Sequence, residues 1–157
     1  MAKRFKHIYL ELTDICDRKC SFCPPVTRPR KFMETAEAFR YLEEAAELTE
    51  SVYWHLQGEP LLHPEFRKIT EYAGTLGLTL KLTTNASHLK ELEDHLLSGL
   101  FRQINFSLQS LNEVSPEERE RVRNDIADFT EKALEQCPEL YLNYRWWQDV
   151  PPDLDFF

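Results

Sequence analysis

The chain alternates between two hydrophobic patterns along almost its whole length. Five short segments place apolar residues at every second position, as expected for strands with one buried face. These predicted strands cover residues 8–13, 52–57, 78–84, 103–109 and 140–146. Between them, apolar residues recur every three or four positions, which predicts helices over residues 35–48, 64–76, 87–97 and 115–136. Strands that alternate with helices favour an α/β fold with a parallel sheet.

Each predicted strand is apolar on one face and polar on the other. In the first strand, for example, Ile8 and Leu10 alternate with Tyr9 and Glu11. A doubly wound sheet or a closed barrel buries both faces, so its strands are apolar throughout. We therefore predict a parallel, partial (open) TIM-like barrel of about five βα units with helices on its convex face. The alternative is an open sheet whose polar face is simply solvated.

Three cysteines follow the first predicted strand directly. Cys16, Cys20 and Cys23 have the spacing C-x3-C-x2-C, and thiolates are soft ligands that suit zinc or iron–sulfur clusters. Structural zinc sites usually add a second cysteine pair, whereas the one other cysteine here, Cys137, continues the apolar stripe of the last helix. The spacing thus favours an iron–sulfur cluster, and we expect Cys137 to be a small packing residue. Three thiolates leave one iron of a four-iron cluster open.

The carboxyl ends of the other predicted strands carry polar groups. In parallel α/β folds, ligands bind at this edge of the sheet. Gly58 allows the backbone to approach a ligand closely, and Glu59 offers a carboxylate for a cationic amine. Asn85 and Ser107 offer neutral hydrogen bonds, and Arg145 offers a guanidinium for a carboxylate. We expect these groups to meet the cysteine loop on one rim.

Composition narrows the class of partner. The chain has 157 residues and a formal net charge of −8, which argues against nucleic acid because phosphate binding needs a basic surface. No apolar stretch approaches the roughly 20 residues of a membrane span, so we expect no membrane partner. The basic N-terminus lacks the apolar core of a secretory signal, and free thiols need reducing conditions. These features predict a cytoplasmic protein.

The motifs resemble those of the radical S-adenosylmethionine (SAM) superfamily. The C-x3-C-x2-C loop, with aromatic Phe22 just before its last cysteine, is similar to the defining motif of that family. Residues 58–60 (Gly-Glu-Pro) look like its second-strand motif, and residues 84–85 (Thr-Asn) look like its third-strand motif. Ser107 stands where the family has a polar fourth-strand residue. The resemblance covers residues 5–145.

This resemblance implies a reaction and its cofactors. Cys16, Cys20 and Cys23 would bind a [4Fe–4S] cluster whose open iron is chelated by SAM. Reductive cleavage of SAM would give a 5′-deoxyadenosyl radical that abstracts hydrogen from a substrate. The resemblance also implies a reducing partner such as flavodoxin or ferredoxin. The polar concave face favours a polar small-molecule or peptide substrate.

The resemblance also assigns cofactor contacts. Gly58 and Glu59 would help to hold the methionyl amine of SAM. The backbone of Phe22 would contact the adenine, and Asn85 and Ser107 would help to bind the nucleoside or the carboxylate. We also expect Arg145, whose guanidinium suits a carboxylate, among the cofactor-binding residues.

The chain departs from the family pattern in sequence and in length. Gln57 and Ala86 stand where family members often have glycine. The family has about six βα units, whereas five are predicted here. We expect residues 1–157 to form a single radical SAM core domain, truncated after the fifth strand. It would act as a minimal enzyme, or as a homodimer or with a partner subunit that completes the barrel. The alternative is a non-catalytic iron–sulfur or zinc-binding module that serves as a partner subunit.

Overall fold

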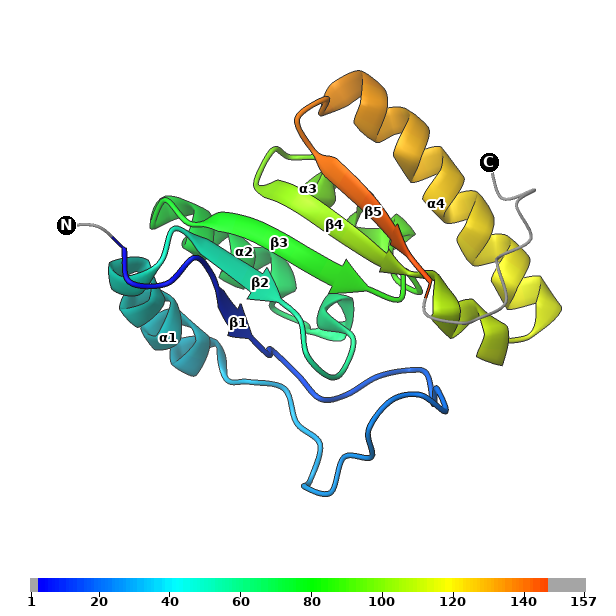
Figure 1. Cartoon of the computed structure of the whole chain (residues 1–157), viewed down its shortest axis with the longest axis horizontal. Coiled ribbons are helices and arrows are strands. Elements are labelled where there is room, and N and C mark those ends of the chain that lie inside the picture. The colour runs from blue at the N-terminus through cyan, green and yellow to red at the C-terminus, as the bar shows by residue number, and fades with distance from the viewer. Residues whose placement is uncertain (1–2, 147–157) are drawn as a thin grey trace.

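The computed structural model describes residues 3–146 and contains one five-stranded sheet (Figure 1). All neighbouring strands are parallel, and their order in the sheet follows their order in the chain. The strands are β1 (Ile8–Leu10), β2 (Ser51–Trp54), β3 (Thr79–Thr84), β4 (Phe101–Ser107) and β5 (Tyr141–Arg145). The predicted α/β fold with a parallel sheet is confirmed.

Helices cover the apolar face of this sheet. They are α1 (Thr35–Leu48), α2 (Phe66–Thr75), α3 (Glu93–Leu96) and α4 (Pro116–Gln136). Three short 3-10 helices are η1 (Pro60–Leu62), η2 (Lys90–Leu92) and η3 (Leu108–Glu113). Figure 1 shows α2 and α3 behind the strands, with the other face of the sheet toward the viewer. Among the described residues, no helix combines the length and apolar character needed to cross a membrane.

The core forms where the apolar strand positions meet the helices. Trp54, Leu80 and Ile104 are fully buried on the sheet, as are Leu42 of α1 and Phe129 of α4. The alternation seen in the sequence therefore sorts the side chains between the two faces of the sheet. The start of α4 is capped, because the Ser115 hydroxyl accepts a hydrogen bond from the backbone N–H of Glu118 at 3.2 Å.

The polar face of the sheet is held by hydrogen bonds between strands. Asn105 is fully buried, and its amide donates to the Leu82 carbonyl at 2.9 Å and the Thr83 hydroxyl at 3.1 Å. Its side-chain oxygen accepts from Gln103 at 2.7 Å and from Asn143 at 3.2 Å. The four bonds saturate this amide and make the polar face an ordered surface.

Several predicted elements differ from the structure. The first strand, expected over residues 8–13, ends at Leu10, and the fourth, expected over residues 103–109, spans Phe101–Ser107. The helix expected over residues 87–97 is reduced to η2 and the four residues of α3. Its beginning is replaced by a turn, in which Ala86 has a φ of +62° and the Asn85 side chain accepts a hydrogen bond from the backbone of Ser87.

The second strand was expected to reach residue 57, and it ends at Trp54. Beyond it, the backbone N–H of Gln57 donates to the Glu11 carboxylate at 3.0 Å, so the chain turns toward the cysteine loop. Leu56 has a φ of +143° and is 58% exposed, whereas the alternation predicted it on the buried face.

Candidate functional site

The cysteine loop is a long connection that closes on itself at its base. It runs from β1 to α1 and passes the carboxyl ends of the strands (Figure 1). At the base, Thr13 pairs with Phe32 in an isolated antiparallel bridge. The Asp14 carboxylate accepts bonds from the Lys31 backbone and the Arg28 side chain, each at 2.8 Å. The hydrogen bond from Arg28 lowers the pKa of Asp14, which stays ionised at neutral pH.

Gly58 brings the end of β2 against this base. Its φ is +73°, and a Cβ at this position would lie 2.2 Å from the Thr13 carbonyl oxygen and 2.9 Å from that of Ile15. The next residue, Glu59, donates its backbone N–H to the Ile15 oxygen at 2.8 Å. The close approach expected at Gly58 is therefore an approach to the backbone of the cysteine loop.

The other side of the loop is tied to η3 and α4. Arg18 is buried, donates to the Ser110 hydroxyl at 2.6 Å and lies 3.5 Å from the Glu118 carboxylate. The backbone N–H of Ser21 donates to both carboxylate oxygens of Glu113, at 2.8 and 2.9 Å. These contacts between distant parts of the chain fix the loop over the sheet edge, and the sequence pattern held no signal for Glu113.

One cavity of about 170 Å³ lies between the cysteine loop and the strand ends. Eight of the nine residues singled out in the sequence line it: Cys16, Cys20, Phe22, Cys23, Gly58, Glu59, Asn85 and Ser107. The ninth, Arg145, is not among its lining residues and lies on β5 opposite Ser107. The rest of the lining comprises Pro24, His55, Leu56, Thr83, Thr84, Gln109 and Ser110.

The cysteines in this cavity are free thiols with polar groups around them. The Asn85 amide donates to Cys16 Sγ at 3.6 Å, and the Arg18 backbone N–H does so at 3.4 Å. Burial raises the pKa of Cys16, and burial with the charges of Cys23 and Cys16 raises that of Cys20 to about 11. Metal binding must therefore displace the thiol protons, since only thiolates are ligands.

Glu59 is 1% exposed and joins the ends of β2 and β3. Its Oε1 accepts bonds from the Thr84 hydroxyl at 2.7 Å and the Leu61 backbone at 3.1 Å. Among residues 3–146, its Oε2 accepts one bond, from the Asn85 backbone at 2.7 Å, which leaves a lone pair for another donor. Burial raises the pKa of Glu59 to about 7. A cationic group beside Oε2 would favour the ionised form.

The donor set, three free thiols on one cavity wall, is compatible with a cluster. Within residues 3–146, no three His, Cys, Asp or Glu side chains form a group that could hold one metal ion. In a tetrahedral zinc site, with Zn–S bonds of about 2.3 Å, the sulfurs lie close together. A four-iron cluster occupies more space, so three thiols spread around a cavity are compatible with it.

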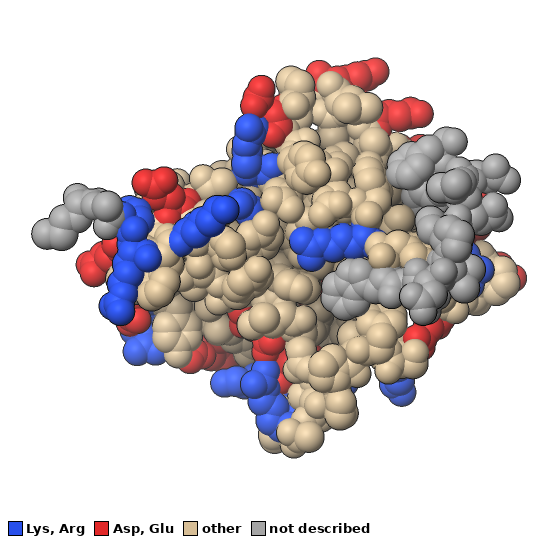
Figure 2. Space-filling view, viewed as in Figure 1, with Lys and Arg blue, Asp and Glu red and all other residues tan. Residues whose placement is uncertain are grey.

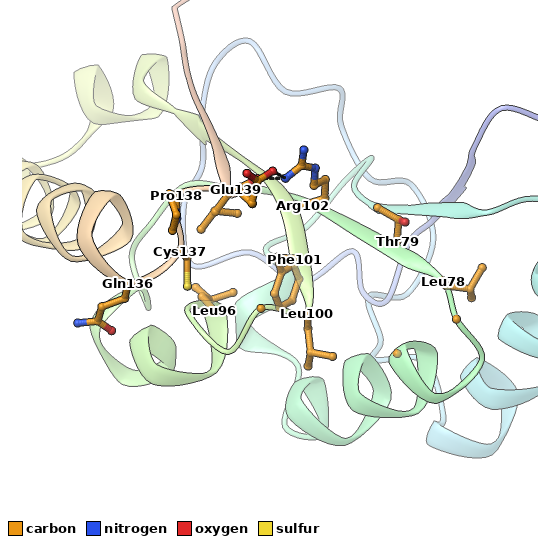
Figure 3. A pocket seen from close by; sticks show the side chains of 14 residues that line it. Leu78, Thr79, Leu96, Leu100, Phe101, Arg102, Gln136, Cys137, Pro138 and Glu139 are labelled. Carbon is orange, nitrogen blue, oxygen red and sulfur yellow. Dashed lines mark hydrogen bonds and ion pairs between the residues drawn. The ribbon is translucent and has the colours of Figure 1, made fainter.

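A larger cavity, of about 590 Å³, lies at the opposite, amino-terminal edge of the sheet (Figure 3). Cys137 lines it, and its thiol donates to the Leu97 carbonyl at 2.8 Å. The charged groups there, Arg102 and Glu139, form an ion pair with each other at 2.8 Å. Cys137 is thus half-buried at a helix end, as expected, and away from the cysteine loop.

The sequence of the chain matches a known family. Residues 10–144 match the profile of the Radical SAM superfamily, and the chain belongs to this superfamily. The resemblance carried by the cysteine loop and the strand-end motifs is therefore confirmed. A [4Fe–4S] cluster and SAM, the cofactors expected from the sequence, are those that the superfamily uses.

Curated relatives carry the name GTP 3',8-cyclase. The protein from Saccharophagus degradans is 33% identical over 118 residues, which cover 71% of this chain and 36% of the relative. The protein from Aquifex aeolicus is 28% identical over 139 residues, which cover 83% of this chain and 42% of the relative. The chain thus spans less than half the length of these relatives.

Solved structures share the fold. SuiB from Streptococcus suis, bound to the precursor peptide SuiA, has a TM-score of 0.72 and 21% identity, over 98% of this chain and 37% of SuiB. BtrN in complex with AdoMet has a TM-score of 0.58 and 15% identity, over 92% of this chain and 58% of BtrN. The likeness to these partial TIM barrels confirms the predicted fold class.

Proposed function

We propose that this chain is the cluster- and SAM-binding core of a radical SAM enzyme. The observation that carries the proposal is the convergence of three free thiols and the ends of β2, β3 and β4 on one cavity. These segments are far apart in the sequence, and their meeting at the carboxyl edge of a parallel sheet is where such folds bind ligands. The proposed single domain covers residues 1–157, of which residues 1–2 and 147–157 lie outside the described residues.

The three cysteines would hold the cluster. A [4Fe–4S] cluster held there would supply the one electron needed for reductive cleavage of SAM to methionine and a 5′-deoxyadenosyl radical, which would remove hydrogen from a substrate. Cys16, Cys20 and Cys23 supply three thiolates, and the Asn85 amide points its N–H at Cys16. Such hydrogen bonds to ligand sulfur tune a metal centre.

The neighbouring residues would orient SAM. The remaining lone pair of Glu59 Oε2 suits the methionyl amine, because a hydrogen bond there would pair the buried carboxylate with a cationic group. Phe22 and Ser107 lie on the same cavity wall and suit the adenine and the nucleoside. Arg145 is not part of this wall, and a role toward the substrate fits its position better.

The surface around the site supports a proposal for the substrate and the partners. The hydrogen-bonded polar face beyond the cavity suits a polar small molecule or a peptide. By their names, the curated relatives act on GTP and SuiB binds a peptide, so both kinds of substrate occur among similar proteins. An acidic flavodoxin or ferredoxin suits the exposed basic residues Lys19, Arg30 and Lys31 of the loop as electron donor, and thiol ligands suit the reducing cytoplasm. A homodimer or a partner subunit would complete the barrel.

The test is SAM cleavage by the reconstituted chain. The protein is loaded anaerobically with iron and sulfide, reduced with dithionite and given SAM, and 5′-deoxyadenosine is measured by mass spectrometry. The proposal predicts deoxyadenosine in wild type and none in Cys20→Ala. A loaded cluster without cleavage would favour a non-catalytic iron–sulfur module, and about one zinc per chain in place of iron would contradict the proposal.

A further inference from the structure

The cysteine loop carries two adjacent cations, which the structure places in different surroundings. Arg18 and Lys19 both lie between Cys16 and Cys20 in the sequence. Lys19 is exposed, whereas Arg18 is 7% exposed and is the one buried Lys or Arg among residues 3–146. Figure 2 shows Lys and Arg side chains on one face of the molecule, many of them beside Asp or Glu side chains. Surface charges of that kind are screened by water and salt, so a buried charge acts more strongly on its surroundings.

Arg18 lies directly behind the wall of the cavity at the strand ends. Its Nη1 donates to the Ser110 hydroxyl at 2.6 Å, and Ser110 lines the same cavity as the three cysteines. The backbone N–H of Arg18 also donates to Cys16 Sγ at 3.4 Å. Both the side chain and the main chain of Arg18 therefore make hydrogen bonds to residues that line this cavity, and the guanidinium is one hydrogen bond away from its wall.

The positive charge of Arg18 is only partly compensated. Within residues 3–146, its one ion-pair partner is Glu118, at 3.5 Å, and the side chain of Glu118 is 38% exposed. The guanidinium Nε and Nη2 are enclosed and have no hydrogen-bond partner in the same part of the chain. A buried charge without close partners is unfavourable. A negative charge placed in the neighbouring cavity would reduce that penalty.

An iron–sulfur cluster on the three cysteines would bring such a negative charge. Each thiolate ligand is an anion, and one-electron reduction makes the cluster more negative by one charge. Net charge is one of the factors that set the reduction potential of such clusters. A fixed cation nearby stabilises the reduced form more than the oxidised form, because the attraction grows with the negative charge. An exposed ammonium has less effect, since water and salt screen it.

We propose that Arg18, and not Lys19, raises the reduction potential of the cluster held by the cysteine loop. Arg18 acts from behind the cavity wall through its charge and needs no contact with the cluster. The electron comes from a one-electron donor, and the guanidinium stays protonated throughout, so no proton is transferred. The inference rests on the proposed function, because it requires a cluster at Cys16, Cys20 and Cys23.

The test is an anaerobic redox titration of the reconstituted full chain with dithionite, in which electron paramagnetic resonance measures the reduced cluster. Arg18→Gln should lower the ratio of reduced to oxidised cluster about tenfold at a fixed potential, which is a shift of about 59 mV to more negative values. Arg18→Lys should keep most of the wild-type potential, because it retains the charge. Lys19→Gln is the matched control and should leave the potential unchanged, since it removes an exposed charge from the same loop.

A second variant tests the same charge from outside the loop. Glu118→Gln removes the ion-pair partner of Arg18 and should shift the potential to more positive values, opposite to Arg18→Gln. Its control is Glu117→Gln, which removes a neighbouring exposed acid and should leave the potential unchanged. If Arg18→Gln fails to load iron, this pair decides, and equal potentials in Glu118→Gln and Glu117→Gln would then overturn the proposal.

The outcomes separate this proposal from the proposed function. A wild-type potential in iron-loaded Arg18→Gln, or an equal shift in Lys19→Gln, would overturn the role of Arg18 and leave the cluster and SAM cleavage in place. Wild type that loads no iron would overturn the proposed function and this inference with it. Circular dichroism of each variant before reconstitution checks that the fold is retained.

Discussion

Replacing Gly58 by alanine tests which of two structural constraints requires glycine at position 58. One reason is its φ of +73°, which a side chain tolerates poorly, and the other is contact with the cysteine loop. The new methyl group would lie 2.2 Å from the Thr13 carbonyl oxygen and 2.9 Å from that of Ile15. Both neighbours are backbone atoms, so neither can rotate away as a side chain would.

The chain contains a matched control for the first reason. Gly77 has the same φ of +73°, and a Cβ there would meet nothing within 4 Å. Gly77→Ala should therefore reduce the free energy of unfolding by about 1–2 kcal/mol, the penalty for a left-handed alanine. At position 58, the new Cβ and the Thr13 carbonyl oxygen must also move apart by about 1 Å to reach an ordinary C···O contact of about 3.3 Å. We expect Gly58→Ala to lose about 3–5 kcal/mol in total.

Urea denaturation of the two variants measures these losses, and iron content after anaerobic reconstitution reports on the loop. Gly77→Ala should load as much iron as wild type. Gly58→Ala should load less, because the loop can relieve the clash only by moving the backbone that leads to Cys16. Equal losses of stability in the two variants, with full iron content in both, would refute this account of Gly58.

Three further predictions concern stability. Burial raises the pKa of Glu59 from its ordinary value of 4.5 to about 7, so the folded chain keeps a proton that the unfolded chain loses. The free energy of unfolding should fall by about 3 kcal/mol as pH rises from 4.5 to 7, and Glu59→Gln should remove this slope in urea titrations across that range. Asn105→Ala breaks four buried hydrogen bonds and should lower the free energy of unfolding by about 2–4 kcal/mol in the same assay. Asn143→Ala breaks one of these bonds and should lower it by about 1 kcal/mol. Equal losses in the two variants would contradict the hydrogen-bond network. Leu56→Gly should leave the melting temperature unchanged or raise stability by up to about 1 kcal/mol, because it relieves a φ of +143° at an exposed side chain; a clear loss would show that Leu56 packs.

The sequence was sufficient to predict which residues line the cavity at the strand ends, because these residues obey a simple geometric rule. Cys16, Gly58, Asn85 and Ser107 all follow or end predicted strands, and parallel strands that end together bring such residues to one edge. The alternating pattern also predicted which face of the sheet meets the helices. Local patterns were enough for these features because each depends on residues close together in the chain.

Contacts between distant segments account for what the sequence did not predict. Glycine is necessary at position 58 because of the backbone of Thr13 and Ile15. A contact with backbone atoms leaves no pattern in the sequence, so it could not be predicted. The pairing of Ser21 with Glu113 joins residues 92 positions apart. The turn at Ala86 shortened a predicted helix because the Asn85 side chain competes for its first backbone bonds. In each case tertiary hydrogen bonding or packing overrides the local pattern.

The most direct test of the central claim is the iron and sulfide content of three reconstituted proteins: wild type, Cys20→Ala and Cys137→Ala. Cys20 lines the cavity at the strand ends, whereas Cys137 lies at the opposite edge of the sheet. The account predicts about four irons per chain in wild type and in Cys137→Ala, and a loss of most of the iron in Cys20→Ala. Iron that persists in Cys20→Ala, or that is lost in Cys137→Ala, would contradict it.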